Sequence, residues 1–163
     1  MILNNYYPLL SRNVHGGAKQ LVDMNGSKQW PVAGTVHKLE TLMGTVKTAS
    51  TGYGVVLGTG NTPVTFNDYK LSGSQITSFS YTKNVTTGFV NSAQDIYVRG
   101  DYVITNTSST AFTIKEVGVV ALHSSSSNQT TLIERTVLTE PVTIEPGGVG
   151  KITYQIDLYY PTA

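Results

Sequence analysis

The stretch GKITYQIDLYY, residues 150–160, alternates between polar and apolar side chains almost without a break. One set consists of Ile152, Tyr154, Ile156, Leu158 and Tyr160, and the other consists of Lys151, Thr153, Gln155 and Asp157. Successive side chains of a β-strand point to opposite faces of its sheet, so this period of two predicts a strand with one buried face. The opposite face is then available to solvent or to a partner.

Similar segments extend back along the chain to residue 54, with turn-rich clusters between them. They are rich in Val, Thr, Ile and Tyr, whose side chains fit a pleated and half-buried surface. The expected strands are residues 54–58, 76–83, 95–106, 111–123, 131–139, 142–145 and 150–160. Short strands at this spacing are typical of a sandwich, and we predict an all-β, antiparallel, jelly-roll-like β-sandwich over residues 51–163.

Residues 1–50 lack this periodicity, because glycine, proline and asparagine interrupt it repeatedly. We predict an extended N-terminal arm or cap here. The region holds Tyr6, Tyr7 and the only tryptophan, Trp30, and large aromatic side chains are seldom left in water without a surface to cover. These three residues are therefore candidates for an interface, either with the chain's own sandwich or with a neighbouring subunit.

The composition excludes several kinds of partner and chemistry. Charged residues make up 13% of the 163 residues, against roughly 25% in an average soluble protein. The net charge is +1 and no basic stripe occurs, so we do not expect nucleic acid as a partner. The absence of cysteine excludes disulfides and thiolate chemistry. No basic leader or long apolar run is present, so we expect a chain made in the cytoplasm without a membrane partner.

The serine-rich stretch 124–128 predicts the exposed turn of a β-hairpin that spans residues 111–139. A turn centred in this stretch sets Glu116 opposite Arg135. Period-two counting places both charges on the same face as apolar side chains such as Ile114, where an unpaired charge is expensive to bury. A directly opposed carboxylate and guanidinium reduces that cost. We therefore interpret Glu116 and Arg135 as a structural pair.

No local pattern indicates a catalytic, cofactor-binding or metal site. The three histidines, His15, His37 and His123, lie far apart and have no neighbour at a metal-ligand spacing. Glycines at positions 52, 54, 58 and 60 suggest a phosphate loop, but the Gly-Lys-Ser/Thr ending is absent and no helical pattern follows. A tight loop is the simpler interpretation, and we predict no catalysis, no cofactor and no bound metal.

Two alternatives to a purely structural role stay open. The first is a carbohydrate-binding or receptor-binding module that uses exposed tyrosines and the loop 124–128, with a surface glycan as its ligand. Tyrosine offers apolar area and a hydroxyl, and it equally suits core packing or a protein interface. The tyrosines concerned are Tyr81, Tyr97, Tyr102, Tyr154, Tyr159 and Tyr160. The second alternative is a hydrolase with a Ser/His/Asp triad drawn from distant loops, although no G-x-S-x-G elbow occurs.

A longer pattern begins at Val55 and runs to the end of the chain. Its parts are Gly58-Thr59-Gly60, Thr62-Pro63, Asn67-Asp68-Tyr69-Lys70-Leu71, Glu116-Val117-Gly118, Leu132-Ile133-Glu134-Arg135 and the final strand 150–158. In this order and at this spacing the pattern resembles that of small virion proteins of tailed bacteriophages. The match covers residues 53–163 and leaves the N-terminal region unassigned.

This resemblance implies a β-sandwich that serves as a tail, collar, fibre or head accessory subunit in a virion, without catalysis or a cofactor. Its partners would be other virion proteins and copies of itself. Within the turn we expect Gly58 and Gly60 at positive φ, where glycine is tolerated. Pro63 would hold the next segment extended, and Asp68 would cap a short turn before Leu71.

Overall fold

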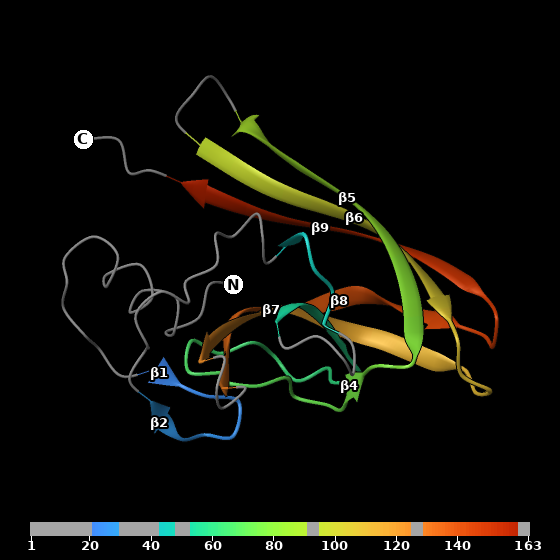
Figure 1. Ribbon diagram of the computed structural model, residues 1–163, viewed down its shortest axis with the longest axis horizontal. Coiled ribbons are helices and arrows are strands. Elements are labelled where there is room, and N and C mark those ends of the chain that lie inside the picture. Colours follow the sequence, from blue (N-terminus) through green and yellow to red (C-terminus); the bar gives the residue numbers. More distant parts are fainter. Residues whose placement is uncertain (1–20, 30–42, 48–52, 91–94, 125–128, 160–163) are drawn as a thin grey trace.

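The computed structural model describes residues 21–29, 43–47, 53–90, 95–124 and 129–159. These residues form two antiparallel sheets that pack as a β-sandwich (Figure 1). The larger sheet has the strand order β4-β3-β7-β8 and the smaller has the order β5-β6-β9. The predicted all-β sandwich is confirmed.

The strands of the larger sheet are β3 (Gly54–Gly58), β4 (Gln75–Ile76), β7 (Phe112–Ser124) and β8 (Gln129–Ile144). Those of the smaller sheet are β5 (Phe79–Val90), β6 (Asp95–Asn106) and β9 (Val149–Tyr159). A short hairpin is formed by β1 (Leu21–Val22) and β2 (Lys28–Gln29). Its turn is joined to β8, because the Met24 N–H donates to the Thr130 carbonyl at 3.0 Å.

Strand β9 shows how the alternating sequence produces a half-buried sheet. Ile152, Tyr154 and Ile156 are only 6–7% exposed, whereas the polar side chains between them are exposed. Pairing with β6 places Ile152 opposite Tyr102 and Tyr154 opposite Gly100. The apolar half of the pattern therefore faces the larger sheet, as predicted from the period of two.

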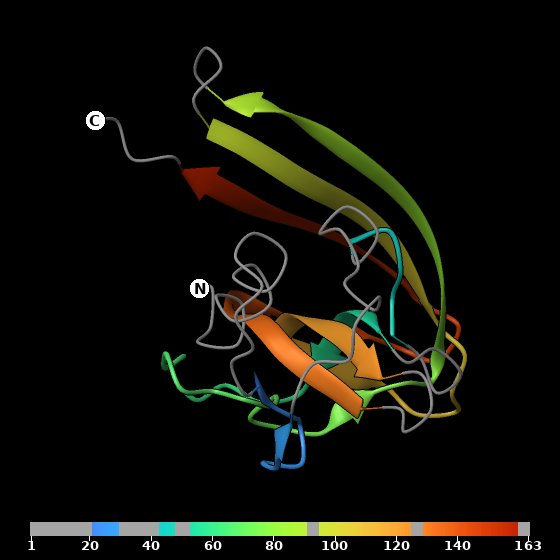
Figure 2. The same ribbon diagram turned by 60° about the vertical axis from the view of Figure 1, so that its left-hand side comes forward.

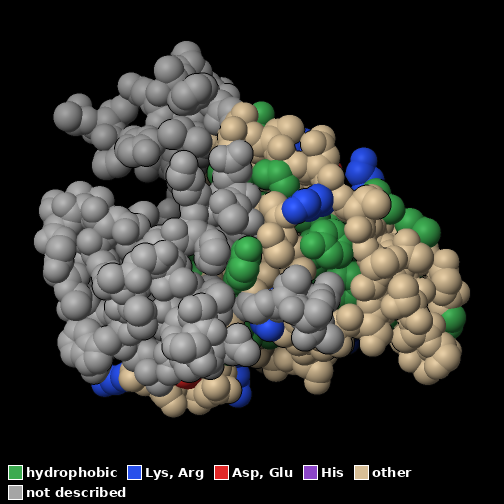
Figure 3. All heavy atoms as spheres, viewed as in Figure 1, with side chains coloured by type: hydrophobic (Ala, Val, Ile, Leu, Met, Phe, Trp, Pro, Cys, Tyr) green, Lys and Arg blue, Asp and Glu red, His purple; other side chains and the backbone are tan. Residues whose placement is uncertain are grey.

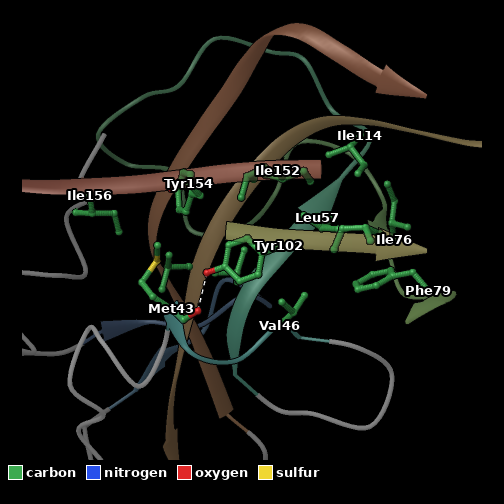
Figure 4. Close-up of a cluster of buried hydrophobic side chains, with 14 of the residues drawn as sticks. Met43, Val46, Leu57, Ile76, Phe79, Tyr102, Ile114, Ile152, Tyr154 and Ile156 are labelled. Carbon is green, nitrogen blue, oxygen red and sulfur yellow. Dashed lines mark hydrogen bonds between the residues drawn. The ribbon is translucent and has the colours of Figure 1, made fainter. Parts of the chain in front are cut away.

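The core lies between the two sheets, and Figure 4 shows part of it. Tyr102 of β6 is at its centre, and its hydroxyl donates to the Met43 carbonyl at 2.6 Å. Burial raises the pKa of the Tyr102 phenol, so this side chain stays neutral. The most completely buried members of the core are Met43, Val46, Val55, Leu57, Tyr102, Ile104, Ile114, Val117 and Val119.

Residues 43–47 belong to the sandwich. Val46 forms a parallel bridge with Val55, the Val55 N–H donates to the Thr45 carbonyl at 2.7 Å, and the Lys47 N–H donates to the Val55 carbonyl at 2.6 Å. Gly54 has a φ of 116°, and a Cβ at this position would collide with the Thr45 carbonyl oxygen. Glycine at position 54 therefore allows this segment to approach β3 closely.

Most of the predicted N-terminal arm, including Tyr6, Tyr7 and Trp30, lies outside the described residues. The structure describes residues 21–29 and 43–47 of this region. Because Met43 and Val46 are both 0% exposed, the last described part of the region contributes directly to the core.

Asn106 ties the connections at one end of the sandwich together, where the two sheets meet in Figures 1 and 2. Its side-chain amide donates to the carbonyls of Thr110 at 2.8 Å and Ile144 at 2.9 Å. Its side-chain oxygen accepts from the Ser108 N–H at 2.8 Å, and its backbone N–H donates to the Gly148 carbonyl at 3.0 Å. One buried side chain therefore links the β6–β7 connection to the β8–β9 turn.

The predicted register of the β7–β8 hairpin is wrong by two residues. Glu116 lies opposite Val137, and Gly118 lies opposite Arg135. A register irregularity between Ile114 and Glu116 also breaks the alternation of faces. Ile114 consequently points into the core, whereas Glu116 points to the outer face of the larger sheet, toward the β3–β4 loop.

Strand β8 is continuous where the sequence suggested two strands, 131–139 and 142–145. Pro141 lies within it at an exposed position, where the ladder with β7 is irregular between Val137 and Val142. Proline has no N–H to donate to a ladder, and edge strands with such irregularities tolerate it.

Candidate functional site

The loop of residues 59–74, which joins β3 to β4, lies against the outer face of the larger sheet. Its Leu71 is buried with Val56 of β3, Val120 of β7 and Leu132 of β8 in a small apolar cluster. Beside this cluster are two buried charged side chains, one from each strand of the central hairpin. They are Glu116 of β7, which is 0% exposed, and Arg135 of β8, which is 1% exposed.

The carboxylate of Glu116 is surrounded by donors from the loop. Its Oε1 accepts from the backbone N–H groups of Gly60 at 2.9 Å and Gly73 at 2.8 Å. Its Oε2 accepts from the Ser72 N–H at 3.0 Å, from the Ser72 hydroxyl at 3.2 Å and from Arg135 Nε at 2.7 Å. Both oxygens of the carboxylate are thus satisfied without water.

The guanidinium of Arg135 links the same hairpin to the first half of the loop. Its Nη1 donates to Asp68 Oδ2 at 2.6 Å, and its Nη2 donates to the Thr62 carbonyl at 2.9 Å. Together with Glu116, these partners use each of the three guanidinium nitrogens. We call Glu116, Arg135 and Asp68 the buried charge cluster.

Asp68 closes a turn inside the loop. Its carboxylate accepts from the Thr65 N–H at 3.1 Å and from the Thr65 hydroxyl at 2.7 Å, and its own N–H donates to the Thr65 carbonyl at 3.2 Å. The turn spans residues 65–68 and precedes Leu71. Because the same carboxylate also binds Arg135, the turn is fixed to the sheet beneath it.

Both acids of the cluster favour the ionised form. Burial alone would raise the pKa of Glu116, but hydrogen bonds from Ser72, Arg135 and Gly73 and the charge of Arg135 outweigh burial and hold that pKa below its usual value. For Asp68, burial is likewise outweighed by the hydrogen bonds from Thr65 and by Arg135, so its pKa is also lowered.

We expect the protein to lose stability in acid through this cluster. In the unfolded chain the carboxyls titrate near their ordinary pKa values, 4.5 for Glu116 and 3.8 for Asp68, whereas the folded chain binds these protons only at lower pH. The cluster's contribution is fully present above about pH 4.5 and is lost as the pH falls through the folded pKa values. Urea denaturation should show a steeper loss of unfolding free energy below this pH in the wild-type protein than in Glu116→Gln.

Glu140→Gln removes a carboxylate from an exposed position of β8 and is the matched control, since it should keep the wild-type acid dependence. The slopes are compared over the pH range in which each variant remains folded. Equal slopes for the wild-type protein and Glu116→Gln would show that Glu116 does not titrate as the geometry requires.

Glycine is needed at positions 58 and 60 because the Glu116 side chain lies close to the backbone there. The expectation of positive φ at these positions is wrong, because the described glycines with positive φ are Gly26, Gly54 and Gly147. A Cβ on Gly58 would lie 2.7 Å from Glu116 Oε1, and one on Gly60 would lie 2.5 Å from the same oxygen. The Gly58-Thr59-Gly60 turn therefore makes room for a buried carboxylate.

The geometry of the cluster indicates that it anchors the loop 59–74 to the larger sheet and is not a reactive centre. The Glu116 carboxylate is closed to solvent and fully occupied by donors, so it cannot reach the proton of a bound substrate as a general base would have to. No protein-family model, curated protein or solved structure matches the chain. The function must therefore be argued from the site and the surfaces of this chain.

The structure brings together most of the site residues that the sequence singled out. Glu116, Arg135, Asp68 and Gly60 meet in the cluster, and Gly58 borders it. Pro63 is exposed. It forms none of the hydrogen bonds described for the charge cluster, but it directly follows Thr62, whose carbonyl accepts a hydrogen bond from Arg135.

Two contributors, Ser72 and Gly73, were not expected from the sequence, and Thr62 was expected only as the residue before Pro63. They act mainly through backbone groups, which carry no side-chain signal. The one hint in the sequence is the pair of small residues Ser72-Gly73 directly after Leu71. The structure explains the glycine, because a Cβ at position 73 would lie 2.7 Å from the Thr59 hydroxyl. Small residues at that point let the two ends of the loop lie side by side.

The described tyrosines do not form a single exposed face. Tyr102 and Tyr154 are buried in the core, and Tyr81 is half-buried on the same inner face of the smaller sheet. Tyr97 lies on the opposite face of β6, by the regular alternation of that strand. The side chains of Tyr159 and Tyr160 and the loop residues 125–128 lie outside the described part of the chain. The described residues thus add no observation in favour of a sugar-stacking face.

Within the described ranges, no group of three or more His, Cys, Asp and Glu side chains is placed to hold a metal ion. His15 and His37 lie outside these ranges, and the side chain of His123 is not among those described. The described segments also contain no helix with the length and apolar character needed to span a membrane.

Proposed function

We propose that this chain is a non-enzymatic structural subunit of a bacteriophage particle, of the tail, collar, fibre or head accessory type, which acts by assembling with other virion proteins and with copies of itself. The resemblance of residues 53–163 to small virion proteins supports the virion assignment. The surface of the smaller sheet supports the assembly role.

The outer face of the smaller sheet is the observation that carries the proposal. The three strands are paired without a register shift, so alternate residues of each strand share this face. They are Ser80, Thr82, Asn84 and Thr86 of β5, Tyr97, Arg99, Asp101, Val103 and Thr105 of β6, and Val149, Lys151, Thr153, Gln155 and Asp157 of β9. Ten of these 14 side chains are uncharged, and the four charged ones are Arg99, Asp101, Lys151 and Asp157. In Figure 3 the described surface seen from one side shows scattered Lys and Arg side chains.

Three of the four charged side chains on this face are bound by neighbouring side chains. Arg99 Nη2 and Asp101 Oδ1 form an ion pair at 3.0 Å, and the Thr153 hydroxyl donates to Asp101 at 2.6 Å. The Gln155 amide donates to Asp157 at 2.7 Å. Charged residues are depleted in the cores of protein interfaces because burying them is costly. A subunit could therefore cover this face without leaving many unpaired charges.

The buried charge cluster complements this role, because it fixes the longest described loop of the chain to a rigid sheet. A subunit in an assembly benefits from a preorganised surface, since ordering it on binding would weaken the contact. Gly60 and Asp68 of the phage-like pattern contribute to this contact, together with Ser72 and Gly73, which lie outside the pattern.

Electron microscopy of purified phage particles with gold-labelled antibodies against this chain tests the assignment. We expect label at one defined position of the particle, and recovery of the chain when particle proteins are identified by mass spectrometry. A chain that is abundant in the lysate but absent from gradient-purified particles would overturn the assignment. Glycan-array binding that Tyr97→Ala abolishes would favour the receptor-binding alternative, and turnover of polysaccharide or peptide would favour the hydrolase.

A further inference from the structure

We propose that the free edge of β5 pairs with β5 of a second copy of this chain about a two-fold axis at Asn84, which joins two smaller sheets into one six-stranded sheet. The inference rests on the proposed assembly function and deepens it, because it names a second copy as one partner and places the contact.

Strand β5 presents a long edge. It pairs with β6 along its whole length, from Phe79 opposite Asn106 to Val90 opposite Asp95. No other described segment pairs with its second side, and β5 lies at the outer margin of the smaller sheet in both views (Figures 1 and 2). The backbone N–H and C=O groups of alternate residues therefore point away from the sheet, ready to bind another strand.

This edge lacks most of the features that prevent pairing. Edge strands are usually protected by short length, proline, bulges or charges, but β5 has 12 residues, no proline and no register shift. Its one charged residue is Lys83. The edge strand β8 of the larger sheet differs, since it contains Pro141, several register shifts and a hydrogen bond from Met24 to Thr130.

The sequence of β5 suits pairing with itself. A two-fold axis at Asn84, near the middle of the strand, would set Thr82 opposite Thr86 of the second copy on the outer face. Threonine pairs on neighbouring strands are favourable. The same axis would set Lys83 opposite Val85, so that the two lysines do not face each other. Two-fold dimers with identical contacts on both subunits are also the commonest form of protein oligomer.

The other free edge of the smaller sheet, β9, suits this pairing less well. It has 11 residues, and its outer face carries Lys151 and Asp157. In the pairing proposed for β5, the only side chains brought opposite one another on the outer face are hydroxyls and amides. The contact therefore buries backbone groups that become hydrogen-bonded and few charges that would need a partner.

A charge-exchange experiment tests both the edge and the register. Thr82 and Thr86 are exposed, so their substitution should leave the fold intact, which circular dichroism and thermal unfolding will verify. In Thr82→Lys/Thr86→Lys, each new lysine faces a lysine of the second copy, and we expect the dimer Kd measured by analytical ultracentrifugation to rise at least about tenfold. In Thr82→Lys/Thr86→Glu, opposite charges face each other, and the wild-type Kd should return. Val149→Lys/Gln155→Lys adds the same charge to β9 and should leave the Kd unchanged.

Each other outcome overturns the inference. A wild-type chain that remains monomeric at every concentration rules out the dimer. A dimer that Thr82→Lys/Thr86→Lys leaves intact uses another surface. Equal weakening of the dimer by Thr82→Lys/Thr86→Lys and by Thr82→Lys/Thr86→Glu excludes the register centred on Asn84. These results leave the virion assignment standing if the chain is still found in particles, whereas absence from particles together with the expected dimer behaviour would remove only the virion assignment.

Discussion

Arg135→Leu should lower the free energy of unfolding by about 3–5 kcal/mol, because it leaves a fully buried carboxylate without its counter-ion. Glu116 would keep its backbone donors but lose the Arg135 Nε bond of 2.7 Å, and Asp68 and the Thr62 carbonyl would lose their partners as well. Urea denaturation followed by far-ultraviolet circular dichroism measures the change in the free energy of unfolding. Arg99→Leu is the matched control: Arg99 is 43% exposed in its pair with Asp101, and solvent screens such exposed pairs, so the loss should be much smaller.

A double-mutant cycle separates the ion pair from its surroundings. Glu116→Gln keeps the shape and one acceptor oxygen of the side chain, and its combination with Arg135→Leu should show a coupling of about 1–3 kcal/mol. Additive effects would mean that the two side chains do not interact. Replacing both residues by leucine should restore only part of the stability, because the N–H groups of Gly60, Ser72 and Gly73 would lose their acceptor.

Gly60→Ala should be strongly destabilising among substitutions of single small residues in the loop. Its Cβ would lie 2.5 Å from Glu116 Oε1 and would also collide with the Ser72 hydroxyl and the backbone of Gly73. Overpacking typically costs about 1–3 kcal/mol, and we expect the upper end of this range because the displaced groups are the hydrogen-bond partners of a buried charge.

Gly147→Ala provides the comparison for the loop glycine. Its φ of 70° should cost about 1 kcal/mol, but a Cβ there meets nothing within 4 Å. Chemical denaturation of both variants measures the difference in unfolding free energy. A Gly60→Ala variant no less stable than Gly147→Ala would show that the loop does not approach Glu116 as closely as described.

The burial pattern of strand β9 was predictable because its signal is local. The alternation from Ile152 to Ile156 follows from the geometry of one extended strand, and the same three side chains are buried in the fold. The contact between Glu116 and Arg135 was predicted from a hairpin register that is wrong by two residues and from the cost of burying an unpaired charge. The second argument holds although the first does not. Arguments of this kind need no knowledge of the neighbouring strands.

The position of the charge cluster was not predictable, because it depends on distant parts of the chain. The irregularity between Ile114 and Glu116 changes the face of the sheet on which the carboxylate lies, and period-two counting assumes that no such irregularity occurs. The loop 59–74 then supplies backbone N–H groups from residues more than 40 positions away. Backbone donors are the same for nearly every residue type, so the sequence cannot mark them.

The core contribution of Met43 and Val46 was hidden for a similar reason. Gly44 lies between them and no alternation of polar and apolar residues surrounds them, so no periodic pattern marks either residue as buried. Their burial depends on the close approach that Gly54 permits and on the Tyr102 hydroxyl that binds the Met43 carbonyl. Such contacts between segments become visible only in the folded chain.

Amide hydrogen exchange at Gly60, Ser72 and Gly73, measured by NMR, tests most directly whether the buried charges fasten the loop to the sheet. If they do, these three N–H groups exchange as slowly as those of the paired strand β7, and Arg135→Leu accelerates their exchange more than that of β9. Fast exchange at all three positions in the wild-type protein, as in a free loop, would contradict the fastening and the structural role assigned to the cluster.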